Sequence, residues 1–113
     1  MLKRRKMYTS KALKYLNLFG SKNLEGVRQT LAPEAQLRDW DNTANNREEF
    51  ISVVSRIFEG TNNLSVEVLN TVEQDTTVVV EMKISVDDDE LLVTDVIEFE
   101  SSGLITAVRA YLG

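Results

Sequence analysis

The second half of this chain carries the pattern that most restricts its fold, because apolar and polar residues alternate along it. The alternating or apolar runs are residues 64–68, 78–86, 91–99 and 104–112. Successive side chains of a β-strand face opposite sides of a sheet, so each run predicts a strand. Turn-forming residues separate the runs, at positions 74–75, 87–89 and 101–103. Strands joined by three such hairpins predict an antiparallel sheet.

Apolar residues in the first half recur every three to four positions, as in amphipathic helices. Residues 8–19 predict a first helix, with Thr9 or Ser10 as its N-terminal cap. A second helix is expected to start after Asn23 and to end by Pro33. Proline ends it because the residue before a proline is disfavoured in helical backbone.

A short strand, a polar loop and a third helix are expected before the sheet. The strand is residues 35–39, and residues 41–45 have the composition of a loop. Asn46 begins the third helix, with Glu49 three residues further on as in a capping box, and Gly60 closes it. Helices that precede the strands pack on one face of the sheet, which predicts the α+β class.

The absence of two residue types narrows the possible chemistry, since the chain contains neither cysteine nor histidine. This excludes disulfides, thiol nucleophiles, cysteine-based zinc sites and an imidazole base. Catalysis would therefore use carboxylates, tyrosine, lysine, hydroxyls or backbone groups. The length of 113 residues predicts one domain over residues 1–113.

Basic residues gather at the start of the chain. Six of the 13 lysines and arginines precede residue 15, and no acidic residue precedes Glu25. Such an arm can bind nucleic acid or anionic lipid, or it can be a flexible, solvated start at residues 1–7. We favour the flexible start and expect no nucleic-acid partner, because the rest of the chain is acidic and repels phosphate. No apolar run approaches the roughly 20 residues of a membrane span, so we expect a cytoplasmic protein with no membrane partner.

One carboxylate interrupts the apolar face of the third predicted strand. Asp95 shares that face with four large apolar residues, Leu91, Val93, Ile97 and Phe99. Burial disfavours the charged form of a carboxyl group and raises its pKa. A structural interpretation pairs Asp95 with a backbone donor or with Arg109. A functional interpretation makes it a neutral acid that donates a hydrogen bond inside a pocket.

Two other residues are candidates for the same pocket. Tyr15 lies among apolar neighbours on the first helix, and its hydroxyl needs a polar partner. Asp39 ends the short strand that follows the second helix. The alternatives are that Tyr15 is a core aromatic with a solvated hydroxyl and that Asp39 only forms a turn.

The order of these elements resembles the nuclear transport factor 2-like fold, most closely its ketosteroid isomerase and SnoaL-like group. The segments that carry the resemblance are residues 15–16, 22–27, 31–39, 95–99, 103–105 and 109–111. The resemblance extends over residues 11–113. It implies three N-terminal helices packed in the concave face of a curved, four- to six-stranded, mainly antiparallel sheet, a cone-shaped α+β barrel.

The resemblance also implies roles for the three candidate residues. Asp39 falls on the family's general base, Tyr15 on its oxyanion-hole donor and Asp95 on its protonated, hydrogen-bond-donating aspartate. The chemistry implied is the transfer of a proton next to a carbonyl group, as in isomerases and cyclases. This chemistry requires no cofactor and no metal.

The pocket implied by the resemblance would hold a small hydrophobic molecule between the helices and the sheet. Its candidate lining residues are Trp40, Val78, Val80, Met82, Ile97, Val108 and Leu112. Trp40 is a core residue in an alternative interpretation. The acidic run at residues 87–90 resembles a metal site in composition, but it lacks a calcium loop's spacing and is expected to be a solvated turn.

Three functions remain open at this point. The chain is an isomerase- or cyclase-type enzyme, a non-catalytic module that binds the same kind of ligand, or an interaction protein. A homodimer is expected to form through the second face of the sheet, where Val79 lies among polar and charged residues.

Overall fold

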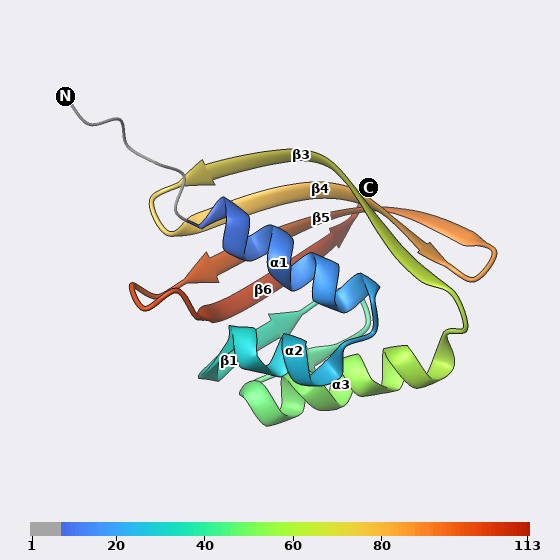
Figure 1. The fold of residues 1–113 in the computed structure, drawn as a ribbon, viewed down its shortest axis with the longest axis horizontal. Helices are drawn as coiled ribbons and strands as arrows, with labels where there is room; N and C mark the ends of the chain where they lie inside the picture. Colours follow the sequence, from blue (N-terminus) through green and yellow to red (C-terminus); the bar gives the residue numbers. More distant parts are fainter. Residues whose placement is uncertain (1–7) are drawn as a thin grey trace.

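The computed structural model describes residues 8–113, and the predicted flexible basic start at residues 1–7 lies outside them. Three helices lie against one face of a six-stranded sheet that curls around them without closing (Figure 1). The elements are α1 (Thr9–Gly20), α2 (Leu24–Thr30), β1 (Leu31–Arg38), β2 (Thr43–Ala44), α3 (Arg47–Gly60), β3 (Leu64–Gln74), β4 (Thr77–Val86), β5 (Asp89–Phe99) and β6 (Ile105–Leu112). The predicted α+β architecture is confirmed, and the described residues contain no helix long and apolar enough to span a membrane.

The sheet has the strand order β2-β1-β6-β5-β4-β3. The predicted hairpins are confirmed, because β3, β4, β5 and β6 pair antiparallel with their chain neighbours. In contrast, β1 pairs parallel with β6, so the sheet is mixed. β1 begins at Leu31 rather than at residue 35, and Pro33 lies where its register with β6 is interrupted. An interruption accommodates proline, which has no N–H for a regular ladder.

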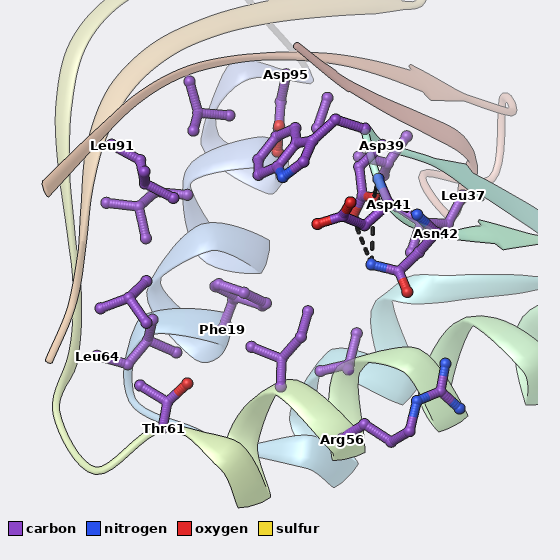
Figure 2. A pocket seen from close by; sticks show the side chains of 18 of the residues that line it. Phe19, Leu37, Asp39, Asp41, Asn42, Arg56, Thr61, Leu64, Leu91 and Asp95 are labelled. Carbon is purple, nitrogen blue, oxygen red and sulfur yellow. Dashed lines mark hydrogen bonds between the residues drawn. The ribbon is translucent and has the colours of Figure 1, made fainter. Parts of the chain in front are cut away.

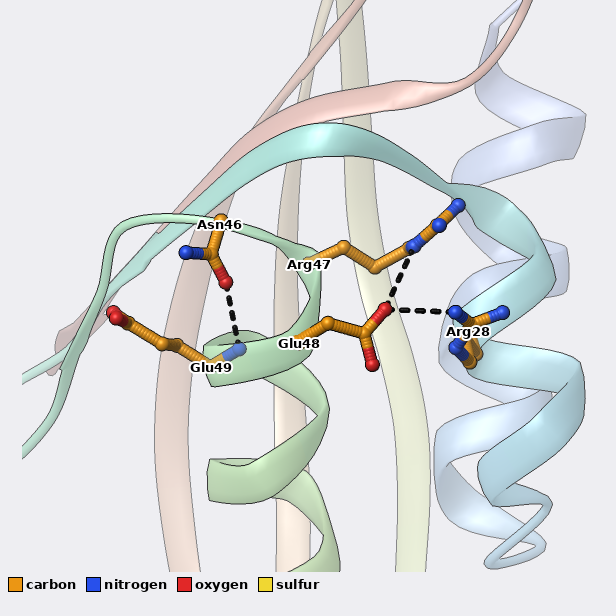
Figure 3. A network of polar contacts seen from close by, with 5 residues as sticks. All are labelled: Arg28, Asn46, Arg47, Glu48 and Glu49. Atoms are coloured by element: carbon orange, nitrogen blue, oxygen red, sulfur yellow. Dashed lines mark hydrogen bonds and ion pairs between the residues drawn. The ribbon is translucent and has the colours of Figure 1, made fainter.

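Asparagine caps begin two of the helices as predicted. The Asn23 side chain accepts a 2.8 Å hydrogen bond from Gly26 N at the start of α2. Asn46 accepts a 2.9 Å bond from Glu49 N (Figure 3). The Glu49 carboxylate in turn accepts a 2.9 Å bond from Asn45 N. The two asparagine side chains satisfy amides of the first helical turn, which have no partner within the helix.

An ion pair on the surface connects α2 with α3. Arg28 Nη2 lies 2.7 Å from Glu48 Oε2, and Arg47 Nε lies 3.4 Å from the same oxygen (Figure 3). The hydrogen bond from Arg28 is the main cause of a lowered pKa of the Glu48 carboxyl group. Because Glu48 is exposed, this pair contributes little to the stability of the fold.

The N-terminus of α1 is capped differently from the prediction. The helix already begins at Thr9, so the prediction of Thr9 or Ser10 as its cap is wrong. Glu73, on the edge strand β3, accepts hydrogen bonds from Thr9 N at 2.8 Å, Thr9 Oγ1 at 2.6 Å and Tyr8 N at 3.2 Å. A carboxylate at a helix N-terminus also interacts favourably with the helix dipole.

Replacing Glu73 with alanine is expected to lower the free energy of unfolding by about 1–2 kcal/mol, because it removes the cap of α1. Glu73→Gln keeps an acceptor and is expected to lose about half as much. Urea denaturation measures both effects. The matched control is Glu67→Ala, an exposed glutamate on the same strand; an equal loss in that variant would show that the cap is not what Glu73 contributes.

Candidate functional site

A cavity of about 390 Å³ lies between the concave face of the sheet and helices α1 and α3 (Figure 2). Aliphatic and aromatic side chains make up most of its wall. These apolar lining residues include Leu16, Phe19, Phe50, Val54, Ile57, Leu64, Ile84, Leu91, Val93 and Val108. Its size falls within the range of about 300–1,000 Å³ that is usual for small-molecule pockets.

The structure brings together Tyr15, Asp39 and Asp95 on the wall of this cavity. Tyr15 comes from the buried face of α1, and its ring lies edge-on against Phe50 of α3 with ring centroids 6.4 Å apart. Asp95 comes from the middle of β5, and Asp39 follows directly after β1. Three distant segments of the chain therefore bring these three polar groups to a mostly apolar cavity.

Asp95 is the most unusual of the three groups. Only 6% of the residue is exposed, and none of the hydrogen bonds or ion pairs found among residues 8–113 involves its carboxyl group. The Arg109 interpretation is wrong, because Arg109 pairs with Glu98 instead. Burial, and secondarily the charge of Asp39, raise the pKa of the Asp95 carboxyl to about 7. Asp95 can therefore be neutral near neutral pH and act as a hydrogen-bond donor.

The Asp39 and Asp95 carboxyl groups on the cavity wall also affect the Tyr15 hydroxyl. Burial raises the pKa of the Tyr15 hydroxyl well above its usual value, and the nearby Asp95 and Asp39 carboxylates raise it further. Tyr15 is thus a protonated donor rather than a base. Only 4% of Tyr15 is exposed, which agrees with its interpretation as a core aromatic, and the residue also lines the cavity.

Asp39 is held in a turn formed by the residues that follow it. Its Oδ1 accepts hydrogen bonds from Asp41 N at 2.8 Å and Asn42 N at 2.6 Å. The Asn42 side-chain amide lies 3.2 Å from each carboxylate oxygen (Figure 2). The turn interpretation is therefore correct, and the same turn places Asp39 on the cavity wall. Oδ1 accepts three of these hydrogen bonds, whereas Oδ2 accepts only the one from the Asn42 side-chain amide.

The predicted lining residues divide into two groups. Trp40 and Val108 lie on the cavity wall, and Trp40 is 43% exposed, which excludes its interpretation as a core residue. The others lie elsewhere: Val78, Val80, Met82 and Ile97 are fully buried in the core, and Leu112 is half-exposed at the end of β6.

The position of α1 explains why these residues miss the cavity. Tyr8, just before α1, stacks on Phe99 at the end of β5 with ring centroids 5.1 Å apart. The start of α1 therefore covers this end of the sheet. The cavity lies toward the other end of the same apolar face, where the wall is formed by Ile84, Leu91 and Val93.

Several residues on the wall were not predicted. Asp41 and Asn42 lie beside Asp39, while Arg56 and Thr61 come from α3 and its end. Asp41 and Asn42 could have been expected from the sequence, because Asp and Asn side chains favour turns of the kind that holds Asp39. Among the described residues there is no group of three or more potential metal ligands.

Comparisons with known proteins identify the fold first. An NTF2-like protein of unknown function from Cytophaga hutchinsonii superposes with a TM-score of 0.82 at 12% identity, over 99% of this chain and 95% of that one. A proposed SnoaL-like isomerase from Agrobacterium tumefaciens gives 0.83 at 15% identity, over 96% and 99%. A proposed polyketide cyclase from Sinorhizobium meliloti gives 0.81 at 14% identity, over 95% and 99%. Likeness at these identities establishes the nuclear transport factor 2-like fold and nothing about activity.

The family follows from the sequence itself. Residues 12–108 match the SnoaL-like domain, so the chain belongs to the SnoaL-like family. No curated protein matches the chain. The resemblance stated above is thereby confirmed for both fold and family.

Proposed function

We propose that the cavity binds a small hydrophobic carbonyl compound and transfers a proton next to its carbonyl group, without a cofactor. The observation that carries this proposal is the buried Asp95 carboxyl group, which has no partner among the described residues and lines a mostly apolar cavity with Tyr15 and Asp39. A carboxyl group without a partner at such a position is costly to the fold, and perturbed carboxyls of this kind concentrate at functional sites.

In the proposed mechanism, Asp39 removes a proton from the carbon next to the carbonyl and returns it further along the conjugated system. Tyr15 and neutral Asp95 donate hydrogen bonds to the developing enolate oxygen. A ligand that fills the cavity displaces water from the Tyr15 and Asp95 donors. Both hydrogen bonds to the ligand are stronger because no water competes for them. The turn around Asp39 keeps the base in place before substrate binds.

The alternative is a module that binds the same class of ligand without turnover. The same cavity supports it, because an apolar wall with a few polar groups provides binding whether or not a proton moves. The two functions differ in one measurable step, the abstraction of a proton.

Proton exchange in heavy water tests the proposed activity. The substrates are a panel of β,γ-unsaturated ketones of increasing size, and proton NMR follows the loss of signal at the carbon next to the carbonyl. We expect exchange well above the buffer rate and conjugation of the double bond, seen as a new ultraviolet absorbance. If ketones bind, as detected by the fluorescence of Trp40, but no proton exchanges, the non-catalytic function is correct.

We further propose a homodimer that pairs through the outer face of the sheet. Strand register places Val72 beside Val79, and Tyr111 and Leu92 lie on the same face of neighbouring strands. Val72 is 62% exposed and Tyr111 is 53% exposed, which leaves apolar surface available for a second copy. Light scattering at increasing concentration is expected to give twice the monomer mass; a monomer mass throughout would contradict the dimer.

A further inference from the structure

Opposite walls of the cavity differ in chemical character. Aliphatic side chains from β3, β4 and β5 form one wall, among them Leu64, Ile84 and Leu91. The facing wall ends in an acidic rim, which we define as residues 39–41, two aspartates flanking a tryptophan. Figure 2 shows Leu64 and Leu91 on one side of the cavity, and Asp39 and Asp41 on the other. Such a cavity suits a ligand with one apolar and one polar side.

The charges on the wall favour a cation. Besides the buried Asp95, two aspartates line the cavity, Asp39 and Asp41, and among the described residues Arg56 is the one basic side chain on its wall. The Asp41 carboxylate makes no hydrogen bond or ion pair within residues 8–113, and it points into the cavity (Figure 2). The Asp39 carboxylate, in contrast, is already bound by the turn. Asp41 is thus the carboxylate best placed to bind a charged ligand.

Asp95 gives a second, independent indication of a polar ligand. It is 6% exposed, it has no partner within the described residues, and it lies deeper in the same cavity. A buried polar group of this kind requires a partner, which the ligand supplies. The deep end and the rim therefore each present an oxygen to the ligand, with apolar surface between them.

Arg56 does not reverse this preference. It is exposed on α3, and the one hydrogen bond described for it joins its Nη1 to Ser52 Oγ at 3.4 Å, one turn earlier on the same helix. The exposed indole of Trp40, within the acidic rim, adds a surface that attracts cations through its π-electrons. The adjoining carboxylate and indole together outweigh one solvated guanidinium.

We propose that the ligand of this cavity is a hydrophobic organic cation, with an ammonium nitrogen at the acidic rim and its hydrocarbon portion along the aliphatic wall. This inference rests on the proposed function, because it concerns the same cavity, and it names the class of ligand that the cavity binds. Within the proposed chemistry the substrate is a carbonyl compound that carries an amine. The ammonium lies between the Asp41 carboxylate and the Trp40 indole, while the carbonyl oxygen faces Tyr15 and Asp95.

Three ligands with the same hydrocarbon chain test the charge preference: n-octylammonium, 1-octanol and octanoate. Trp40 is the only tryptophan of the chain, so its fluorescence reports binding at the acidic rim, with calorimetry as a second measurement. We expect octylammonium to bind about 5- to 10-fold more tightly than octanol, and octanoate to bind most weakly. None of these ligands contains a ketone, so failure of proton exchange with neutral ketones leaves this result unaffected.

Two variants with the same change in net charge separate the acidic rim from general electrostatics. Asp41→Asn is expected to reduce the ammonium-to-octanol ratio to about twofold or less. Asp75→Asn, in the β3–β4 turn and away from the cavity wall, is expected to leave the ratio unchanged. Equal binding of all three ligands, tighter binding of octanoate, or an equal effect of the two variants would each overturn the proposal.

Discussion

Replacing Asp95 with asparagine is expected to stabilise the folded protein at pH 8 by about 2–4 kcal/mol. Burial raises the pKa of the Asp95 carboxyl to about 7 in the folded state, whereas an unfolded aspartate has a pKa of about 3.9. Between these values the unfolded chain binds fewer protons, so the free energy of unfolding falls as pH rises. Below about pH 4 both states are protonated and the cost disappears. Asparagine does not titrate and therefore avoids the cost.

The measurement is the difference in unfolding free energy between Asp95→Asn and the natural sequence, by urea denaturation at pH 4, 6 and 8. This difference is expected to be near zero at pH 4 and to grow with pH until it levels off above 7. Asp75→Asn serves as the control, since it removes an exposed carboxylate in a turn, and it is expected to give a flat profile. A difference for Asp95→Asn that does not change with pH would contradict the assignment of a neutral buried acid.

Replacing Asp39 with asparagine is expected to reduce proton transfer by about 10²- to 10⁴-fold. The amide has nearly the same shape and keeps an oxygen that can accept the hydrogen bonds of the turn, but it cannot take up a proton. Because the cavity wall is preserved, binding of ketones is expected to change little. The loss therefore appears in kcat rather than in KM.

The same variant has an effect that needs no substrate. The charge of Asp39 is the second cause of the raised pKa of Asp95, so Asp39→Asn is expected to lower the pKa of the Asp95 carboxyl. Carbon-detected NMR of the carboxyl groups measures this shift. An unchanged pKa would show that the two groups do not share the cavity, and full proton transfer in the variant would show that another residue is the base.

The fold was predictable wherever its signals are local. The alternation along β4 and β5 and the Asn23 and Asn46 caps each depend on residues close together in sequence. The parallel pairing of β1 with β6 and the capping of α1 by Glu73 join segments more than 60 residues apart. No local pattern encodes such contacts, because they depend on how the sheet curls. Strand β2 has only two residues, so it is likewise too short to show an alternation of apolar and polar side chains.

The candidate site was predictable in its chemistry more than in its position. Asp95 stands out from alternation alone, because it interrupts an apolar face. Alternation identifies the apolar face of the sheet, but it does not show which part of that face the helices leave uncovered. The prediction therefore places Val80 and Met82 on the cavity wall, whereas Ile84 and Leu91 form it. The covering helix decides this, through contacts such as Tyr8 on Phe99. Arg56 lies on the exposed face of α3, where no sequence signal distinguishes it from other surface residues.

The open sheet has a consequence for the range of ligands that the cavity can accept. Its edge strands, β2 and β3, do not pair with each other, so no backbone hydrogen bonds cross the gap between them. A larger ligand can spread the two edges by bending the sheet, without breaking any strand pairing. Tyr15, Asp39 and Asp95 would keep their own anchoring elements during such a change. Changes at the two edges can therefore alter the size of the cavity while Tyr15, Asp39 and Asp95 stay on the elements that carry them.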